Sequence, residues 1–295
     1  MHADHHYEIG SSHAACEDYA MSGTHNGLSY AIVSDGCSSS DDTDVGARIL
    51  CHIAKSALLY LHRQGPLTND YYIQNQFPSV FKSLVLMKAI EARASLRLDY
   101  NAFDATLLVA FAAERPDNDP AWGYICFGDG VTVLRYTDGH ARAMRMSYSS
   151  NAPYYLSYGM SKDKDDAYRA ALGDATRHNT FIDLFPHGKY EEVKDYECEP
   201  CTDYTHMASS DVMLDVPDQI VLFSDGVGSY EDKDRNAAPD MGVVREALSY
   251  KNTAGEFVKR RMRAMGKKFA ADGISHYDDM SCAAVHIGGP RVEGL

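Results

Sequence analysis

The sequence predicts an α+β fold built around a layered, mainly antiparallel β-sheet. Strand-like runs open the chain, two long helical patterns follow, short strands fill the middle, and a helix and a strand close it. Few positions offer the strand–helix–strand unit that parallel sheets require. The chain has 295 residues, enough for one large domain or two small ones, and no internal repeat.

The first hundred residues alternate between strand and helix signals. Residues 28–33 form an apolar, strand-like run. Residues 43–62 carry apolar side chains at helical spacing, with Asp42 or Thr43 as the expected N-cap. Pro66 and the polar stretch after it interrupt this helix. A second long helix is expected over residues 79–98.

The second half of the chain begins with three short runs rich in β-forming residues, 105–112, 122–127 and 131–136. They predict antiparallel strands with a hairpin at Gly128-Asp129-Gly130. The signals weaken over residues 139–217, where we expect an irregular insertion that forms a lid or flap. A strand at 219–224, a helix at 253–271 and a strand at 280–287 complete the prediction.

Composition excludes several classes of partner. The chain carries 28 basic and 42 acidic residues, a net charge of −14, which argues against nucleic acid. No apolar run approaches the roughly 20 residues of a membrane span, so no membrane partner is expected. The first ten residues lack the apolar segment of a secretory signal, so we expect a cytoplasmic protein. The seven cysteines are then expected to be reduced.

Three weaker patterns each have a plain interpretation and a functional alternative. Cys198 and Cys201, with His206 nearby, resemble half of a zinc site, but no second cysteine pair exists, so two ordinary thiols are favoured over a redox switch. The histidines among the first six residues are attributed to a flexible terminus. The basic stretch 259–268 is interpreted as a solvated helix face, with an acidic partner or phosphorylated substrate as the alternative.

Short acidic motifs are the most informative feature of the chain. In order they are Cys16-Glu17-Asp18, Ser34-Asp35-Gly36, Gly128-Asp129-Gly130, Ser224-Asp225-Gly226 and Tyr277-Asp278-Asp279-Met280. Three of them directly follow strongly apolar strand-like runs, which places their carboxylates at the rim of a sheet. Several carboxylates gathered at one rim repel one another unless cations lie between them. Oxygen ligands alone favour Mg²⁺ or Mn²⁺ over Zn²⁺.

In their order and spacing these motifs resemble the signature of the type 2C family of metal-dependent serine/threonine protein phosphatases. The resemblance extends from about residue 7 to residue 287 and includes the final Asp278-Asp279-Met280-Ser281. It implies a single domain over residues 1–295, made of a pair of packed antiparallel sheets flanked by helices, an αββα sandwich, with metal ions in a cleft at one end.

The resemblance also implies a role for each motif. Asp35 would bridge two metal ions, one completed by the Gly36 carbonyl with Glu17 and Asp18, the other by Asp225 and Asp278. Asp129 would help to bind a third ion, and Asp279 belongs to the same metal-binding motif. Two such ions about 3.5–4 Å apart activate a bridging hydroxide that attacks phosphorus directly.

Two positions depart from the family pattern. Cys37 stands where the family commonly has a histidine that serves as general acid, and a thiol is a poor substitute. His13, four residues before Glu17, stands near the position of a phosphate-binding arginine. It could bind phosphate when protonated, or act as the acid.

The sequence therefore predicts Mg²⁺- or Mn²⁺-dependent hydrolysis of phosphoserine and phosphothreonine in a phosphoprotein substrate, with Asp35, His13 and Cys37 as catalytic residues. Two alternatives stay open. One is a weak or inactive pseudophosphatase that acts through protein contacts, and the other is a phosphatase of small phosphoesters. The oligomeric state is not predicted.

Overall fold

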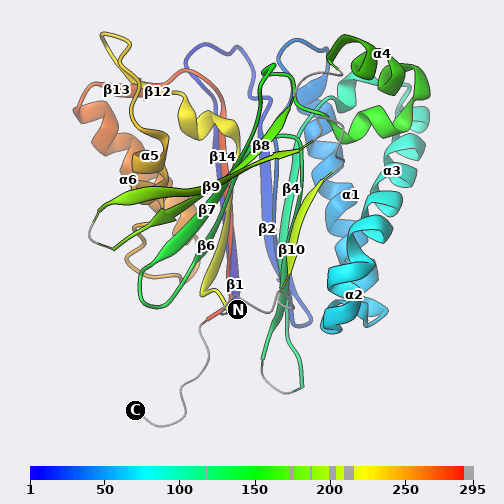
Figure 1. Cartoon of the computed structure of the whole chain (residues 1–295), viewed down its shortest axis with the longest axis horizontal. Coiled ribbons are helices and arrows are strands. Elements are labelled where there is room, and N and C mark those ends of the chain that lie inside the picture. Colours follow the sequence, from blue (N-terminus) through cyan, green and yellow to red (C-terminus); the bar gives the residue numbers. More distant parts are fainter. Residues whose placement is uncertain (117–118, 173–175, 187, 199–203, 209–215, 289–295) are drawn as a thin grey trace.

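The computed structural model shows two antiparallel β-sheets stacked face to face with helices on both outer faces (Figure 1). It describes residues 1–116, 119–172, 176–186, 188–198, 204–208 and 216–288. This is the α+β sandwich that the sequence predicts. Within the described residues no helix is both long enough and apolar enough to span a membrane.

The larger sheet has seven strands in the order β1-β14-β11-β6-β7-β8-β9, and each neighbouring pair is antiparallel. Its strands are β1 (His2–Glu8), β6 (Gly130–Arg135), β7 (Ala141–Tyr148), β8 (Arg177–Leu184), β9 (Tyr190–Cys198), β11 (Gln219–Phe223) and β14 (Met280–His286). The first and last strands of the chain therefore lie side by side.

The smaller sheet has five strands in the order β10-β5-β4-β3-β2, again all antiparallel. They are β2 (Tyr19–His25), β3 (Leu28–Ser34), β4 (Leu107–Ala113), β5 (Ala121–Phe127) and β10 (Thr205–Ala208). A separate two-stranded ribbon pairs β12 (Tyr230–Asp232) with β13 (Ile274–His276).

The helices divide between the two outer faces. They are α1 (Thr43–Arg63), α2 (Asp70–Asn75), α3 (Phe77–Leu96), α4 (Lys162–Leu172), α5 (Asp240–Ala247) and α6 (Phe257–Ala271). Apolar side chains of α1 and α3 pack on the five-stranded sheet, and those of α5 and α6 pack on the seven-stranded sheet. Four short 3₁₀ turns connect these elements: η1 (Pro66–Thr68), η2 (Asn101–Phe103), η3 (Leu156–Met160) and η4 (Asp225–Gly228).

A third apolar cluster fills the space between the sheets. Val33, Leu108, Ile220, Leu222 and Val285 contribute to it from both sheets. The central strands are buried on both faces, which explains why β3, β4, β5 and β11 read as continuous apolar runs rather than as alternating ones. The carboxylates that follow β3, β5 and β11 therefore emerge at the edge of this core.

The strands and long helices predicted from apolar patterns are confirmed to within a few residues, but the predicted hairpin at Gly128-Asp129-Gly130 is wrong. β5 belongs to the five-stranded sheet and β6 to the seven-stranded sheet, so the turn carries the chain from one sheet to the other. Gly128 has φ 86° and Gly130 φ 129°, conformations that only glycine adopts readily. A short glycine turn between two strands gives the same sequence signal in both arrangements.

The segment 139–217 is more regular than expected, which corrects the expectation of an irregular insertion. β7, β8 and β9 extend the larger sheet, and β10 joins the smaller one. In β7 buried apolar residues mostly alternate with Arg142, Arg145 and Ser147, and this mixed composition concealed the strand. Residues 149–172, which contain η3 and α4, stand outside both sheets.

The N-terminus also differs from its predicted flexible state. Residues 2–8 form the edge strand β1, paired along its whole length with β14. Asp4 is buried, and its carboxylate accepts a hydrogen bond of 3.0 Å from the backbone N–H of Lys259 in the first turn of α6. His5 Nδ1 lies 2.9 Å from Ser22 Oγ. Cys201, the second cysteine of the weak zinc pattern, lies outside the described residues.

Candidate metal centre

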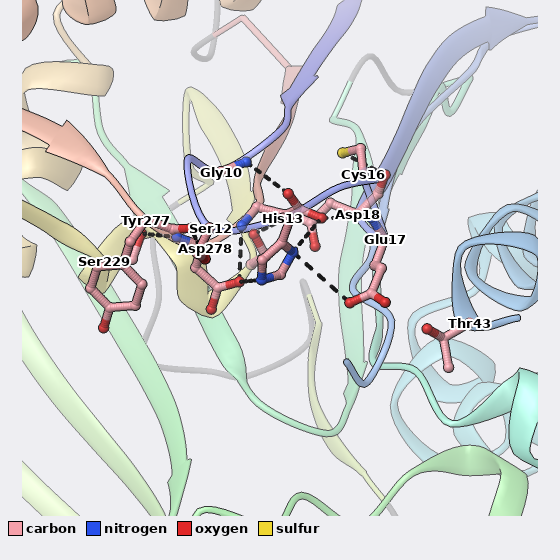
Figure 2. Close-up of polar contacts among 12 residues, drawn as sticks. Gly10, Ser12, His13, Cys16, Glu17, Asp18, Thr43, Ser229, Tyr277 and Asp278 are labelled. Carbon is pink, nitrogen blue, oxygen red and sulfur yellow. Dashed lines mark hydrogen bonds and ion pairs between the residues drawn. The ribbon is translucent and has the colours of Figure 1, made fainter. Parts of the chain in front are cut away.

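The acidic motifs meet at one end of the sandwich, where the connections between strands gather. Asp35 follows β3, Asp129 lies in the turn from β5 to β6, Asp225 follows β11, and Asp278 precedes β14. The loop from β1 to β2 crosses the same end and brings Asp18 to them. Figure 2 shows this loop with His13 between Asp278 on one side and Glu17 on the other.

The carboxylates of Asp18 and Asp225 both lie against that of Asp35, close enough for their charges to act on it. Burial, followed by the charges of Asp18 and Asp225, raises the pKa of Asp35 well above its usual range. Burial and the charge of Asp225 likewise raise the pKa of Asp129 and of Asp278. These five acidic residues are thus close enough to interact electrostatically, and the charge of each one disfavours ionisation of the others.

Asp18 carries the plainest sign of a cation site. Its side chain is 1% exposed, and burial raises its pKa to about 7 despite its hydrogen bonds. Asp18 Oδ2 accepts a hydrogen bond of 2.7 Å from Ser224 Oγ, whereas Oδ1 is buried and has no hydrogen-bond partner among the described residues. A buried carboxylate oxygen without a donor is costly unless an ion occupies its open side. The donor set around it consists of oxygen atoms, which suits Mg²⁺ or Mn²⁺.

The backbone around Asp35 is fixed by its neighbour strand. Asp35 N donates to Thr106 Oγ1 at 3.0 Å, and Thr106 N donates to the Asp35 carbonyl at 2.8 Å. Gly36 forms an isolated β-bridge with Ala105. Thr106 itself is 2% exposed. These contacts hold the Asp35 carboxylate and the Gly36 carbonyl at the end of β3.

Asp279 anchors the loop between β1 and β2. Its Oδ1 accepts a hydrogen bond of 2.7 Å from Gly10 N, and its Oδ2 accepts one of 2.6 Å from Glu17 N and lies 3.1 Å from His13 Nδ1. Both of its oxygens are engaged by the loop, so these contacts give Asp279 a positioning role beside its predicted role as a ligand. Gly226 is equally constrained, because a Cβ there would lie 1.8 Å from the Asp279 carbonyl oxygen.

His13 lies among three carboxylates. Its Nε2 is 3.3 Å from Asp278 Oδ1, and its Nδ1 is 3.1 Å from Asp279 Oδ2 and 4.0 Å from Glu17 Oε2. Burial disfavours the charged imidazole, but the hydrogen bond to Asp279 and the charges of Asp279, Asp278 and Glu17 outweigh it and raise the pKa of His13. The structure thus favours a doubly protonated imidazole at this position.

The same loop forms the wall of an open cleft of about 270 Å³, lined by His13, Ala14, Ala15, Glu17 and Ser38. One ligand atom each from His13, Glu17 and Asp279 lie within 4.8 Å of one another, a spacing that could hold a cation. Glu17 Oε2 is buried and, like Asp18 Oδ1, has no hydrogen-bond partner in the described part of the chain.

Cys37 lies on the other side of Asp35, in the loop that leads to α1. Its N–H donates to the Asp104 carbonyl at 2.8 Å, and its thiol is 3.1 Å from Ser39 Oγ. The hydroxyl of Tyr155 is within hydrogen-bonding reach of the same thiol, and burial followed by the charge of Asp129 raises the pKa of Tyr155 far above its usual range. A neutral phenol and a thiol therefore occupy the place where the family commonly has an imidazole.

The supporting roles of several residues were missed in the sequence. Thr106, Ser224 and Gly226 hold Asp35, Asp18 and Asp279 by contacts that cross between strands. Ser224 precedes a motif aspartate and could have been found from the motif itself. Thr106 and Tyr155 carry no local signal, because only the fold brings them to the site.

Comparisons with known proteins bear on the fold and on the family. A crystal structure of a bacterial serine phosphatase superposes with a TM-score of 0.53 at 12% identity, covering 99% of this chain and 100% of that one. A bacterial serine phosphatase bearing an arginine-to-lysine mutation gives a TM-score of 0.56 at 14% identity, with the same coverage. At such identities the likeness concerns the fold alone. None of the curated proteins matches the chain in sequence. The model of the protein phosphatase 2C family matches residues 7–274, nearly the whole chain, and the protein therefore belongs to the protein phosphatase 2C family.

Proposed function

We propose that this protein is a metal-dependent phosphatase that hydrolyses phosphate monoesters, with phosphoserine and phosphothreonine side chains of a phosphoprotein as its substrates. Family membership supports the phosphatase activity. The single observation that carries the metal dependence is Oδ1 of Asp18, which is buried, has no hydrogen-bond partner among the residues that the structure describes, and lies in a cluster of carboxylates that repel one another.

The residues present fit a pair of divalent ions, Mg²⁺ or Mn²⁺. Asp35 would contact both ions, Asp18, Glu17 and the Gly36 carbonyl one of them, and Asp225 and Asp278 the other. Asp129, which interacts electrostatically with Asp225 and Asp278, would help to bind a third, weaker ion. When bound, the ions supply an activated water and neutralise charge on the phosphoryl oxygens.

The other residues of the site orient the ligands and bind the phosphate. Thr106 and Ser224 hold Asp35 and Asp18 in place, as partners of metal ligands commonly do. His13, whose pKa is raised by Asp279 and Asp278, would provide a positive charge in the cleft wall where a phosphate dianion would bind. This favours phosphate binding over acid catalysis for His13. Cys37, with Tyr155 beside it, is then the candidate donor of a proton to the leaving alkoxide.

The pseudophosphatase alternative has one specific observation in its favour. Cys37 and His13 stand where the family commonly has a histidine and an arginine. Against it stands the complete carboxylate cluster, which a protein without metal would have little physical reason to retain. The other alternative, a phosphatase of small phosphoesters, is consistent with the open cleft of about 270 Å³.

The test is hydrolysis of p-nitrophenyl phosphate at neutral pH with Mn²⁺, with Mg²⁺ and with EDTA. We expect metal-dependent turnover that is lost in Asp35→Ala and retained in Asp41→Ala. Asp41 is an exposed acidic residue in the same loop and serves as the matched control. A folded wild-type protein without turnover under either metal contradicts the proposal and supports the pseudophosphatase.

The substrate class needs a second comparison. Active enzyme is offered a phosphothreonine peptide and a phosphotyrosine peptide of otherwise identical sequence. A higher kcat/KM for phosphothreonine supports the proposed class. Equal rates on both peptides and on small phosphoesters favour the interpretation as a phosphatase of small phosphoesters.

A further inference from the structure

Residues 149–172, here called the flap, lie outside both sheets and contact residues next to the candidate site. The flap contains η3 and α4, and Figure 1 shows α4 beside the upper end of α3. Tyr154 and Tyr168 of the flap pack with Tyr148, at the end of β7, in a small cluster of their own. The flap is therefore a compact unit that docks on the sandwich.

Asp104, a residue of the sandwich, joins the flap to the loop that follows Asp35. Asp104 Oδ1 accepts hydrogen bonds from Ser157 Oγ at 2.6 Å and from Lys164 Nζ, both in the flap. Its Oδ2 accepts one from Ser40 Oγ at 3.1 Å, and its backbone carbonyl accepts one from Cys37 N at 2.8 Å. Asp104 thus has two contacts on each side.

The contact with Lys164 is shielded from water. The side chain of Asp104 is 8% exposed and that of Lys164 is 19% exposed. The ammonium also lies 5.3 Å from the centre of the Tyr158 ring, a cation–π contact. Removing one partner of such a pair leaves an uncompensated charge in a poorly solvated place, which is much more disruptive than the loss of an exposed ion pair.

The docked flap also delivers a side chain to the site. Tyr155 directly precedes η3, is 8% exposed, and places its hydroxyl within hydrogen-bonding reach of the Cys37 thiol. The flap and the loop of residues 37–40 (the Cys37 loop) thus meet twice, once through Asp104 and once through Tyr155. Both contacts are made with the Cys37 loop, which follows Asp35 closely in the sequence.

We propose that Asp104 and Lys164 are positioning residues that couple docking of the flap to the geometry of the Cys37 loop, and hence to the site that receives the phosphorylated substrate. The proposal rests on the proposed function for its effect on turnover. The coupling itself is a property of the fold and can be measured without any activity.

The main variant is Lys164→Met, which keeps the length of the side chain and removes its charge. Its matched control is Lys162→Met on the same helix, because Lys162 pairs with Asp166 on the exposed surface, where both side chains are more than half exposed. Lys164→Arg tests rescue by a conservative cation, and Ser157→Ala removes the neutral flap contact to the same Asp104 oxygen.

The first readout is hydrogen exchange in peptides that cover the flap and the Cys37 loop. In Lys164→Met we expect exchange at the Cys37 amide to become at least about tenfold faster, because opening the flap releases Asp104, whose carbonyl accepts that amide. Lys162→Met should match the wild type, and Lys164→Arg should restore most of the protection. Faster exchange confined to the flap overturns the proposal.

The second readout is kinetic. On a phosphothreonine peptide we expect kcat/KM to fall about tenfold in Lys164→Met, mainly through KM, with a smaller loss on p-nitrophenyl phosphate. Equal losses on both substrates, or none, overturn the proposal. If the wild type has no turnover, the proposed function fails and the exchange experiment still decides the coupling. If Lys164→Met does not fold, Ser157→Ala provides the same exchange test.

Discussion

Ser224 offers the sharpest test of how the site is held together. It is fully buried, its Oγ donates to Asp18 Oδ2 at 2.7 Å, and the same oxygen accepts a hydrogen bond from Ser281 N at 2.9 Å. Ser224→Ala removes both interactions and fills no new space. It leaves a buried carboxylate without its donor and a buried N–H without its acceptor.

The expected loss follows from these two contacts. A hydrogen bond to a charged group contributes about 1.5–3 kcal/mol, and a buried polar group left unpaired costs about 1–3 kcal/mol. We therefore expect Ser224→Ala to lower the free energy of unfolding by about 3 kcal/mol. A chain of 295 residues has an unfolding entropy of about 0.6 kcal/mol/K, so Tm should fall by about 5 °C. Metal affinity should weaken about 10–100-fold, because Asp18 loses its orienting partner.

The assay is urea denaturation of metal-free protein, followed by Mn²⁺ titration of the folded variant. Ser56→Ala is the control, since Ser56 lies on the exposed side of α1 and donates only to the His52 carbonyl at 2.8 Å. The control should remain within about 0.5 kcal/mol of the wild type. A Ser224→Ala protein with wild-type stability and wild-type Mn²⁺ affinity would refute the assignment of Asp18 as a ligand oriented by Ser224.

Three further predictions follow from individual contacts. Gly226→Ala forces a Cβ to within 1.8 Å of the Asp279 carbonyl and should cost about 3 kcal/mol in urea denaturation, whereas Gly228→Ala, with open space around it, should be tolerated. Burial disfavours the ionised form of Glu246, but Lys268 and Arg261 stabilise that form more strongly, so the pKa of Glu246 is lowered. These ion pairs therefore stabilise the folded protein above the unfolded pKa near 4.5, and this stabilisation is lost as the pH falls through the folded pKa. The stability difference between wild type and Glu246→Gln should therefore be full at pH 7 and shrink as the pH falls below about 4.5, and a pH-independent difference would contradict this. His13→Asn should raise KM for p-nitrophenyl phosphate about tenfold with a smaller effect on kcat, and an unchanged KM would exclude phosphate binding by His13.

The parts of the fold that follow from local patterns were predictable. The strands that precede Asp35, Asp129 and Asp225 are buried on both faces, so their apolar runs identify them and place each carboxylate at the rim. The helices α1 and α3 followed from their apolar residues. The gathering of these carboxylates followed from the physical argument about strand ends and from the resemblance to the family.

Pairings between distant segments were not predictable from the sequence. Nothing near Gly128 indicates that β5 and β6 belong to different sheets, because a tight glycine turn suits a hairpin equally well. β1 was missed because its residues are mostly polar, and its stability comes from pairing with β14 at the far end of the chain.

The supporting contacts of the site have the same origin. Asp279 binds loop residues more than 260 positions away, and Asp104 meets Lys164 only because the flap docks on the sandwich. Such contacts leave no spacing or periodicity in the sequence. The roles of the ligands were therefore accessible from motifs, while the residues that orient them became visible only in the structure.

The central claim is that the carboxylate cluster around Asp18 and Asp35 holds divalent cations. Its most direct test is isothermal titration of metal-free protein with Mn²⁺, for the wild type and for Asp35→Asn. We predict at least two ions per wild-type chain, and the loss of at least one of them in Asp35→Asn while the variant stays folded. A folded wild-type protein that binds no Mn²⁺, or an Asp35→Asn protein with unchanged binding, would contradict the claim.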